Sequence, residues 1–148
     1  MPIDILLVED NEGDIRLMRE VLREINPTAR LHVVRDGVEA MEFLGYQGPY
    51  LDAPRPSVIL LDLNLPKMQG HEVLARVKAN PHLQTIPVIV LTSSEAETNE
   101  VKSYEVMANS YLKKTGDLSE FEALVKSLND FLLTRVKLPK HEQTVGPL

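Results

Sequence analysis

The sequence predicts an α/β fold in three layers, with a parallel five-stranded sheet between two layers of helices. Short apolar segments alternate five times with longer segments whose apolar residues recur every three or four positions, which is the spacing of one helix face. No hairpin signal joins two successive apolar segments, and parallel strands need long crossover connections. Each strand is therefore expected to be covered by helices and buried on both faces.

The predicted strands are short, apolar and partly β-branched, and they span residues 3–8, 31–34, 57–61, 86–91 and 110–112. The predicted helices span residues 12–25, 38–44, 70–79, 95–107 and 118–134. The first helix ends at Asn26-Pro27, because the residue before a proline avoids the helical region. Residues 45–56 are rich in glycine and proline, which predicts a loop.

Five strand–helix units joined by right-handed crossovers favour the flavodoxin-like (βα)5 arrangement with strand order 2-1-3-4-5. The length of 148 residues fits one domain with an ordinary core. We expect residues 1–135 to form this domain and residues 136–148 to form a C-terminal tail.

Composition and charge exclude several classes of protein. The apolar segments are far shorter than the about 20 residues of a membrane-spanning helix, and the N-terminus lacks the basic start of a secretory signal. A formal net charge of −6 argues against a nucleic-acid surface, which needs a clustered basic face. The chain contains no cysteine and hence no disulfide framework. We expect a cytoplasmic protein that binds neither nucleic acid nor membranes.

Acidic residues follow two strands that the predicted order makes neighbours. Glu9 and Asp10 follow the first strand and Asp62 follows the third, at the switch point where ligands bind in such folds. Three carboxylates around one point must recruit a cation or hold a proton, and oxygen ligands suit Mg²⁺. Asp10 and Asp62 are then direct ligands, the carbonyl of Asn64 is a third, and Glu9 holds a bound water.

Each acidic segment alone also fits an ordinary turn, with Asp10 or Asn11 capping the next helix. The convergence of both segments on one point favours the metal site. Asp62 can in addition act as a nucleophile toward phosphorus. Thr92 and Lys114 close the fourth and fifth strands and can bind phosphoryl oxygens, although singly they also fit a helix cap and a surface lysine.

Four motifs together carry a family resemblance: Val8-Glu9-Asp10-Asn11, Leu60 to Pro66 with Gly70, Leu91-Thr92-Ser93, and Ala108 to Lys114. With these motifs the chain resembles the receiver domain of two-component response regulators, over residues 3 to 131. The resemblance implies that Asp62 accepts phosphate from a sensor histidine kinase and that Glu9 and Asp10 organise the magnesium. It also implies that Thr92 and Lys114 supply the family's hydroxyl and lysine, that Tyr111 is an aromatic switch, and that the chain is not an enzyme beyond self-phosphorylation and slow autodephosphorylation.

The loop 48–56 and the segment 130–139 resemble more closely the small response regulators paired with cyanobacterial phytochromes. This resemblance implies a bilin-binding phytochrome as the kinase, a chain that ends after the receiver, and a homodimer. From the residues themselves, the apolar start of the tail at Val136 to Leu138 indicates either a part of the dimer interface or a frayed terminus. One position departs from the family, because Thr115 replaces the usual proline after Lys114. A cis bond without proline costs about 2.5–4 kcal/mol, so the Lys114–Thr115 bond is either trans or strained.

Two other functions remain open from the residues alone. A magnesium-dependent aspartyl phosphatase would need a second acid where Asn64 stands, and a phosphate-independent interaction module would leave the acids without a role. For the kinase we expect docking on the first helix, where Ile15, Met18 and Leu22 are either partly exposed or part of the core.

Overall fold

The computed structural model describes residues 3–92, 110–113, 119, 122–123, 125–127 and 129–130, with the backbone alone at residues 92 and 110–113. Five parallel strands form one sheet: β1 (Asp4–Val8), β2 (Arg30–Val34), β3 (Val58–Asp62), β4 (Val88–Thr92) and β5 (Ser110–Lys113). Their order is β2-β1-β3-β4-β5. The predicted fold class and strand order are confirmed.

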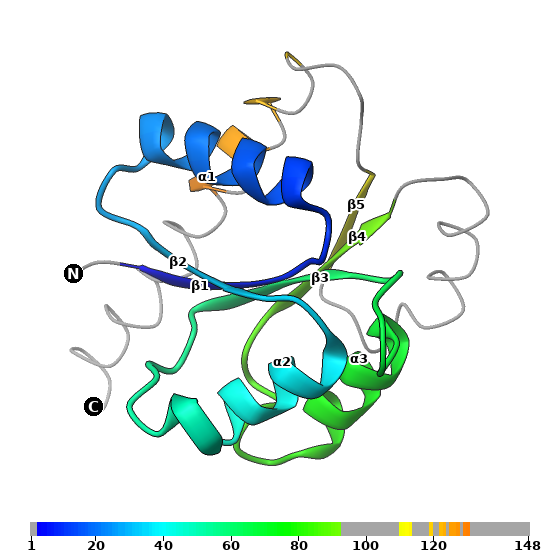
Figure 1. The fold of residues 1–148 in the computed structure, drawn as a ribbon. Helices are drawn as coiled ribbons and strands as arrows, with labels where there is room; N and C mark the ends of the chain where they lie inside the picture. Colours follow the sequence, from blue (N-terminus) through cyan, green and yellow to red (C-terminus); the bar gives the residue numbers. More distant parts are fainter. Residues whose placement is uncertain are drawn as a thin grey trace, which may run out of the picture.

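Helices cover the two faces of this sheet (Figure 1). Helix α1 (Glu12–Ile25) lies on one face, while α2 (Gly37–Leu44) and α3 (Gly70–Ala79) lie on the other. The predicted loop 45–56 contains one short 3-10 helix, η1 (Gly48–Tyr50). The described residues from 119 to 130 are helical, as expected for the last helix, whereas the predicted helix 95–107 lies outside the described residues.

The two faces of the sheet form separate cores, because successive residues of a strand point to opposite sides. In β3, Ile59 and Leu61 pack with α2 and α3, whereas Val58 and Leu60 pack with α1 and Val125. Every residue of β1 and β3 is buried. Burial on both faces of these strands agrees with their almost continuous apolar sequence.

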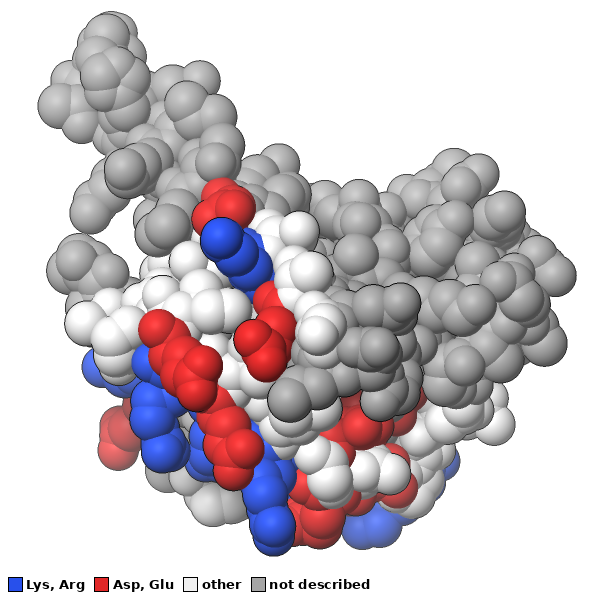
Figure 2. Space-filling model, turned by 90° about the horizontal axis from the view of Figure 1, so that it is seen from above, with Lys and Arg blue, Asp and Glu red and all other residues white. Residues whose placement is uncertain are grey.

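Helix α1 presents a charged outer face. Ile15, Met18 and Leu22 are only 3–4% exposed and belong to the core, so of the two alternatives, burial in the core is confirmed for all three and partial exposure is wrong. They recur every three or four positions and so form the face of α1 that packs against the sheet. Acidic and basic side chains lie next to one another on the face of the molecule that carries α1 (Figure 2). Within the described ranges, no helix has the length and apolar character needed to cross a membrane.

Candidate functional site

Three acidic side chains meet at the carboxyl ends of β1 and β3. Val8 and Leu61 are register partners in these neighbouring strands, so the residues that follow them, Glu9 and Asp62, lie at the same level of the sheet. Carboxylate oxygens of Glu9, Asp10 and Asp62 lie within 4.8 Å of one another. Glu9 and Asp62 are buried, at 1% and 4% exposure, and Asp10 is exposed. The convergence predicted from the sequence is thus present in the structure.

Asp62 is held by the sheet itself. The predicted strand ended at Leu61, but β3 includes Asp62, which pairs in register with Leu91 of β4. One carboxylate oxygen of Asp62, Oδ1, accepts a hydrogen bond from the backbone N–H of Asn64 at 3.3 Å. The parallel ladder therefore fixes the backbone of this acid, and the following loop contributes a donor to its side chain.

Glu9 and Asp10 lie in the turn between β1 and α1. The N–H of Glu9 donates to the carbonyl of Val34 at 3.0 Å, and its Oε2 accepts from the N–H of Asn11 at 3.3 Å. Asn11 is the N-cap of α1, since its Oδ1 accepts from the N–H of Asp14 at 2.9 Å. Of the two caps considered from the sequence, Asn11 fills that position, and Asp10 faces the two buried acids.

The loop after Asp62 alternates buried and exposed residues. Leu63 and Leu65 are each 8% exposed and join the core, while Asn64 between them is exposed. The loop closes where the N–H of Gly70 donates to the carbonyl of Leu63 at 3.1 Å. A Cβ at position 70 would overlap the carbonyl oxygen of Asp62 and the Cα of Leu63, so only glycine fits this close approach.

The donor set fits a hard divalent cation. Two of the three carboxylates are removed from water, where like charges repel strongly unless a cation balances them. All available ligand atoms in the group are oxygens, which suits Mg²⁺ or another hard cation more than a softer metal. Asp10, Asp62 and the carbonyl of Asn64 could hold such an ion directly, and Glu9 could hold one of its waters.

The remaining predicted site residues lie in or directly after the neighbouring strands β4 and β5. Thr92 is the last residue of β4 and pairs in register with Lys113, the last residue of β5, and Tyr111 pairs with Val90. The backbone of Thr92 thus reaches the same end of the sheet as Asp62. The side chains of Thr92 and Tyr111, the whole of Lys114 and the Lys114–Thr115 bond lie outside the described residues.

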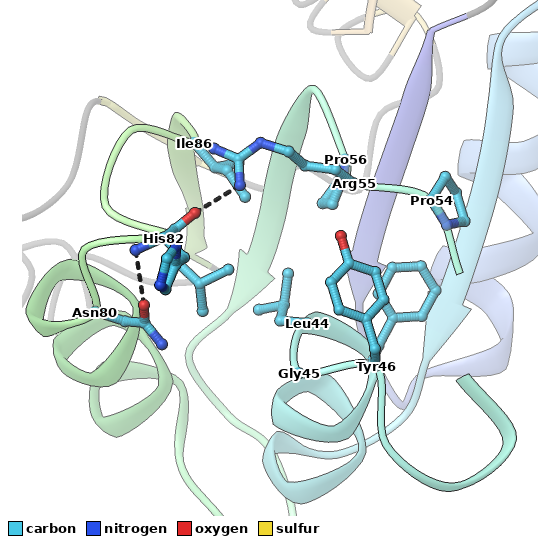
Figure 3. Close-up of a pocket in the computed structure, with 11 residues that line it drawn as sticks. Leu44, Gly45, Tyr46, Pro54, Arg55, Pro56, Asn80, His82 and Ile86 are labelled. Atoms are coloured by element: carbon cyan, nitrogen blue, oxygen red, sulfur yellow. Dashed lines mark hydrogen bonds between the residues drawn. The ribbon is translucent and has the colours of Figure 1, made fainter. Parts of the chain in front are cut away.

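A cavity lies at the end of the sheet opposite the acidic cluster, and none of the predicted site residues line it. It is a cavity of about 400 Å³ between the end of α2, residues 54–56 and residues 80–86. In Figure 3 the side chain of Arg55 reaches across one wall, where it donates to the carbonyl of His82 at 2.5 Å. The cavity is therefore separate from the acidic cluster.

The sequence did not predict that the start of α2 contacts the loop after Asp62. Met68 of this loop packs directly on Gly37, and Lys67 forms an ion pair with Asp36. The Asp36-Gly37 pair is a turn signal that indicates only where a helix begins. Nothing local to either segment indicates that the two touch.

Comparison with known proteins agrees with this geometry. The family model described as "Response regulator receiver domain" matches residues 5–126. Response regulator Rcp1 of Synechocystis sp. is 49% identical over 138 residues, which cover 93% of this chain and 94% of Rcp1. The phosphorylated cyanobacterial phytochrome response regulator RcpA has a similar structure, with a TM-score of 0.83, 44% identity, and coverage of 91% of this chain and 96% of RcpA. The Mn²⁺-bound form of Rcp1 has a TM-score of 0.79 and 48% identity over 88% of this chain and 94% of that chain. The chain belongs to the response regulator receiver domain family.

Proposed function

We propose that this receiver is a phosphorylation switch in which Asp62 accepts a phosphoryl group from the phosphohistidine of a sensor histidine kinase. One observation carries the proposal: the almost fully buried Asp62 ends β3 with its carboxylate within 4.8 Å of ligand oxygens of Glu9 and Asp10. A carboxylate in such a cluster can act both as a nucleophile toward phosphorus and as a ligand of a cation. Membership of the receiver family supports the same role.

The transfer needs little covalent chemistry from the protein. A carboxylate oxygen of Asp62 forms a bond to phosphorus while the bond from phosphorus to the kinase histidine breaks. The electron pair of the broken bond stays on the imidazole nitrogen, which takes up a proton, and Asp62 becomes an acyl phosphate. The receiver contributes chiefly position and charge stabilisation, with the attacking and leaving atoms roughly in line. The ladder pairing of Asp62 with Leu91 supplies that fixed position.

We propose Mg²⁺ as the cation of this site. Asp10, Asp62 and the Asn64 carbonyl would hold it, with Glu9 bound to one of its waters, since Mg²⁺ takes few protein ligands and keeps several waters. When bound, the ion supplies positive charge that offsets the acids and the incoming phosphoryl oxygens. The solved structure of Rcp1 with Mn²⁺ supports a divalent ion here.

We assign the remaining roles from the family resemblance. The Thr92 hydroxyl and the Lys114 ammonium bind phosphoryl oxygens, and Tyr111 turns inward when Thr92 moves toward the phosphoryl group. The chain acts as a phosphoacceptor and not as a turnover enzyme. It acts in the cytoplasm, without nucleic-acid or membrane contacts of its own.

The phosphoacceptor is tested by labelling with acetyl phosphate in the presence of Mg²⁺. We expect the native chain to take up label, Asp62→Asn to take up none, and the control Asp52→Asn, at an exposed loop position, to match the native chain. Label on Asp62→Asn would overturn the assignment. Release of many equivalents of phosphate from small esters would indicate a phosphatase, and absence of metal binding would indicate a phosphate-independent module.

We propose a bilin-binding phytochrome as the kinase, supported by the similarity to RcpA and Rcp1. The test is a phosphotransfer profile against purified histidine kinases, in which a phytochrome kinase should label Asp62 fastest. Faster labelling by unrelated kinases would contradict the pairing.

We further propose a homodimer to which residues 136–148 contribute, beyond a receiver domain formed by residues 1–135. Val136 and Leu138 give this tail an apolar start. Light scattering should find a dimer for the full chain and a larger monomer fraction for a chain ending at residue 135. If both chains showed the same oligomeric state, the tail would not be part of the interface.

A further inference from the structure

We propose that Gly37, at the start of α2, is a positioning residue for the metal site, because its missing side chain sets the position of the loop that carries Asn64. The inference rests on the proposed cation site. It adds a residue that lies on a different element and contributes no ligand of its own. The expected consequence is that the affinity for Mg²⁺ depends on the contact between α2 and this loop.

The contact between Gly37 and Met68 is a contact with backbone. Gly37 is buried, and a Cβ placed on it would overlap the carbonyl oxygen, the carbonyl carbon and the Cβ of Met68. A flexible side chain could turn away from such an overlap, but these atoms move only if the loop itself moves. The contact therefore fixes the distance between the loop and the start of α2.

The start of α2 is itself a firm support. Asp36 is its N-cap, with Oδ1 accepting from the N–H of Glu39 at 2.7 Å, and Oε1 of Glu39 accepts from the N–H of Arg35 at 2.8 Å. These two bonds tie Glu39 to the N-cap side chain and to the backbone just before it, and so stabilise the helix start. The other carboxylate oxygen of Asp36, Oδ2, lies 3.5 Å from Nζ of Lys67, so the same residue also touches the loop.

The loop between Asp62 and Gly70 is also held at other points. Leu63 and Leu65 are anchored in the core on either side of Asn64, and Lys67 then turns the chain through the left-handed region, with φ at 65°. Met68 follows at once and rests on Gly37. Only Pro66 and Lys67 separate Met68 from Leu65, so a displacement of Met68 acts on Leu65 and, through it, on the Asn64 carbonyl. Mg²⁺ demands near-ideal octahedral geometry, so this displacement weakens binding.

The backbone contact outweighs the ion pair. Lys67 is 67% exposed at its side chain, and exposed pairs contribute little because water screens them. We expect Lys67→Gln to change the dissociation constant of Mg²⁺ by less than about fivefold. Gly37→Ala introduces no charge change and acts through position alone.

The test is calorimetric titration of the full chain with Mg²⁺. We expect Gly37→Ala to raise the dissociation constant by about tenfold or more, as is typical for residues that orient ligands. The control Gly45→Ala lies at the other end of α2, where a Cβ would meet the Met41 carbonyl at 3.1 Å, and it should bind Mg²⁺ normally. Labelling by acetyl phosphate should slow in Gly37→Ala at low Mg²⁺ and recover at saturating Mg²⁺.

A folded Gly37→Ala variant with native Mg²⁺ affinity would overturn the proposal. If that variant does not fold, the variants Asp36→Ala and Asp36→Asn provide a second test of the start of α2. Both remove the charge of Asp36, but only asparagine keeps a side-chain oxygen that can cap the helix. Asp36→Ala should bind Mg²⁺ several-fold more weakly, and equal affinities would overturn the proposal. Failure of the proposed function is distinct: the native chain would then bind no Mg²⁺, or Asp62→Asn would accept label.

Discussion

Asp62 pairs in register with Leu91 of β4, so the acid that we propose as phosphoacceptor is part of the sheet and not of the loop after it. Its backbone is held by the sheet, and its side chain accepts a hydrogen bond from the loop. Active groups built on strands are placed more accurately than those on loops. Asn64, two residues later, lies on the loop and depends on the contacts of that loop.

Glu9→Gln should affect metal-free stability and metal affinity in opposite directions. The substitution replaces one of the two buried carboxyl groups of the cluster with a neutral amide and keeps a carbonyl oxygen that can accept from Asn11. We expect the metal-free variant to be more stable by on the order of 1 kcal/mol, because like-charge repulsion falls. Its affinity for Mg²⁺ should fall by about 10- to 100-fold.

Thermal unfolding with a chelator and with Mg²⁺ measures both effects, because an ion that binds the folded state alone raises the free energy of unfolding with its concentration. Glu20→Gln, at an exposed position of α1, is the matched control and should resemble the native chain in both conditions. A Glu9→Gln variant with lower metal-free stability would show that hydrogen bonding to Glu9 outweighs the repulsion.

Met18→Ala should destabilise the fold and leave the chemistry intact. Met18 is 3% exposed and packs in the core between α1 and the sheet, so its truncation should cost about 2–5 kcal/mol. Arg19→Ala, at the exposed neighbouring position, should change stability by less than about 0.5 kcal/mol. Urea unfolding measures the difference, and labelling by acetyl phosphate checks that the site still works.

A Met18→Ala variant of native stability that lost only transfer from the kinase would restore the docking role that burial argues against. The charged outer face of α1 is the surface available to a kinase on this helix.

The acidic site could be predicted from the sequence because its parts follow strands in a fold with few possible topologies. Glu9, Asp10 and Asp62 each come at a strand end, and the strand order brings those ends together. The sequence pattern also predicted which face of α1 is apolar. A periodic pattern does not show how completely each residue is buried, so the burial of Leu22 is known only from the structure. The contact of Gly37 with Met68 joins segments far apart in sequence, and neither segment has a local signal for it.

Tyr46→Gly should stabilise the end of α2. Tyr46 has a φ of 55°, in the left-handed region that costs a side-chain-bearing residue about 1–2 kcal/mol. The N–H of Gln47 donates to the Glu42 carbonyl at 2.9 Å, the bond of a helix end at which glycine usually takes the left-handed position. Tyr46 is 45% exposed, so the loss of its partial burial and glycine's own entropy cost offset much of this strain and leave a net gain of at most about 0.5 kcal/mol.

The matched control is Gln47→Gly, because Gln47 has a φ of −104° and gains nothing from glycine there. Chemical denaturation should give a higher free energy of unfolding for Tyr46→Gly than for the native chain, and a lower one for Gln47→Gly. A loss of stability in Tyr46→Gly would mean that contacts of the ring beside the cavity outweigh the backbone strain.

Asp4 should make the fold sensitive to acid. Burial by itself would raise the pKa of Asp4, but hydrogen bonds from Arg30 and His32 and their charges outweigh burial and lower this pKa below its ordinary value of 3.8. Arg30 donates through Nε to Oδ1 and through Nη2 to Oδ2, both at 2.8 Å, and Nε2 of His32 lies 2.9 Å from Oδ1. A carboxyl whose pKa is lower in the folded state binds fewer protons there than in the unfolded state.

The contribution of Asp4 is therefore fully present above the unfolded pKa and is lost as the pH falls from about 3.8 through the folded pKa. We expect Asp4→Asn to be less stable than the native chain at neutral pH and to lose less stability on acidification, so that the two curves converge below the folded pKa. Urea unfolding across this pH range measures the curves, and Asp52→Asn should follow the native curve. Parallel curves for the native chain and Asp4→Asn would mean that Asp4 has the same pKa folded and unfolded, and that its contacts with Arg30 and His32 do not favour the ionised carboxylate.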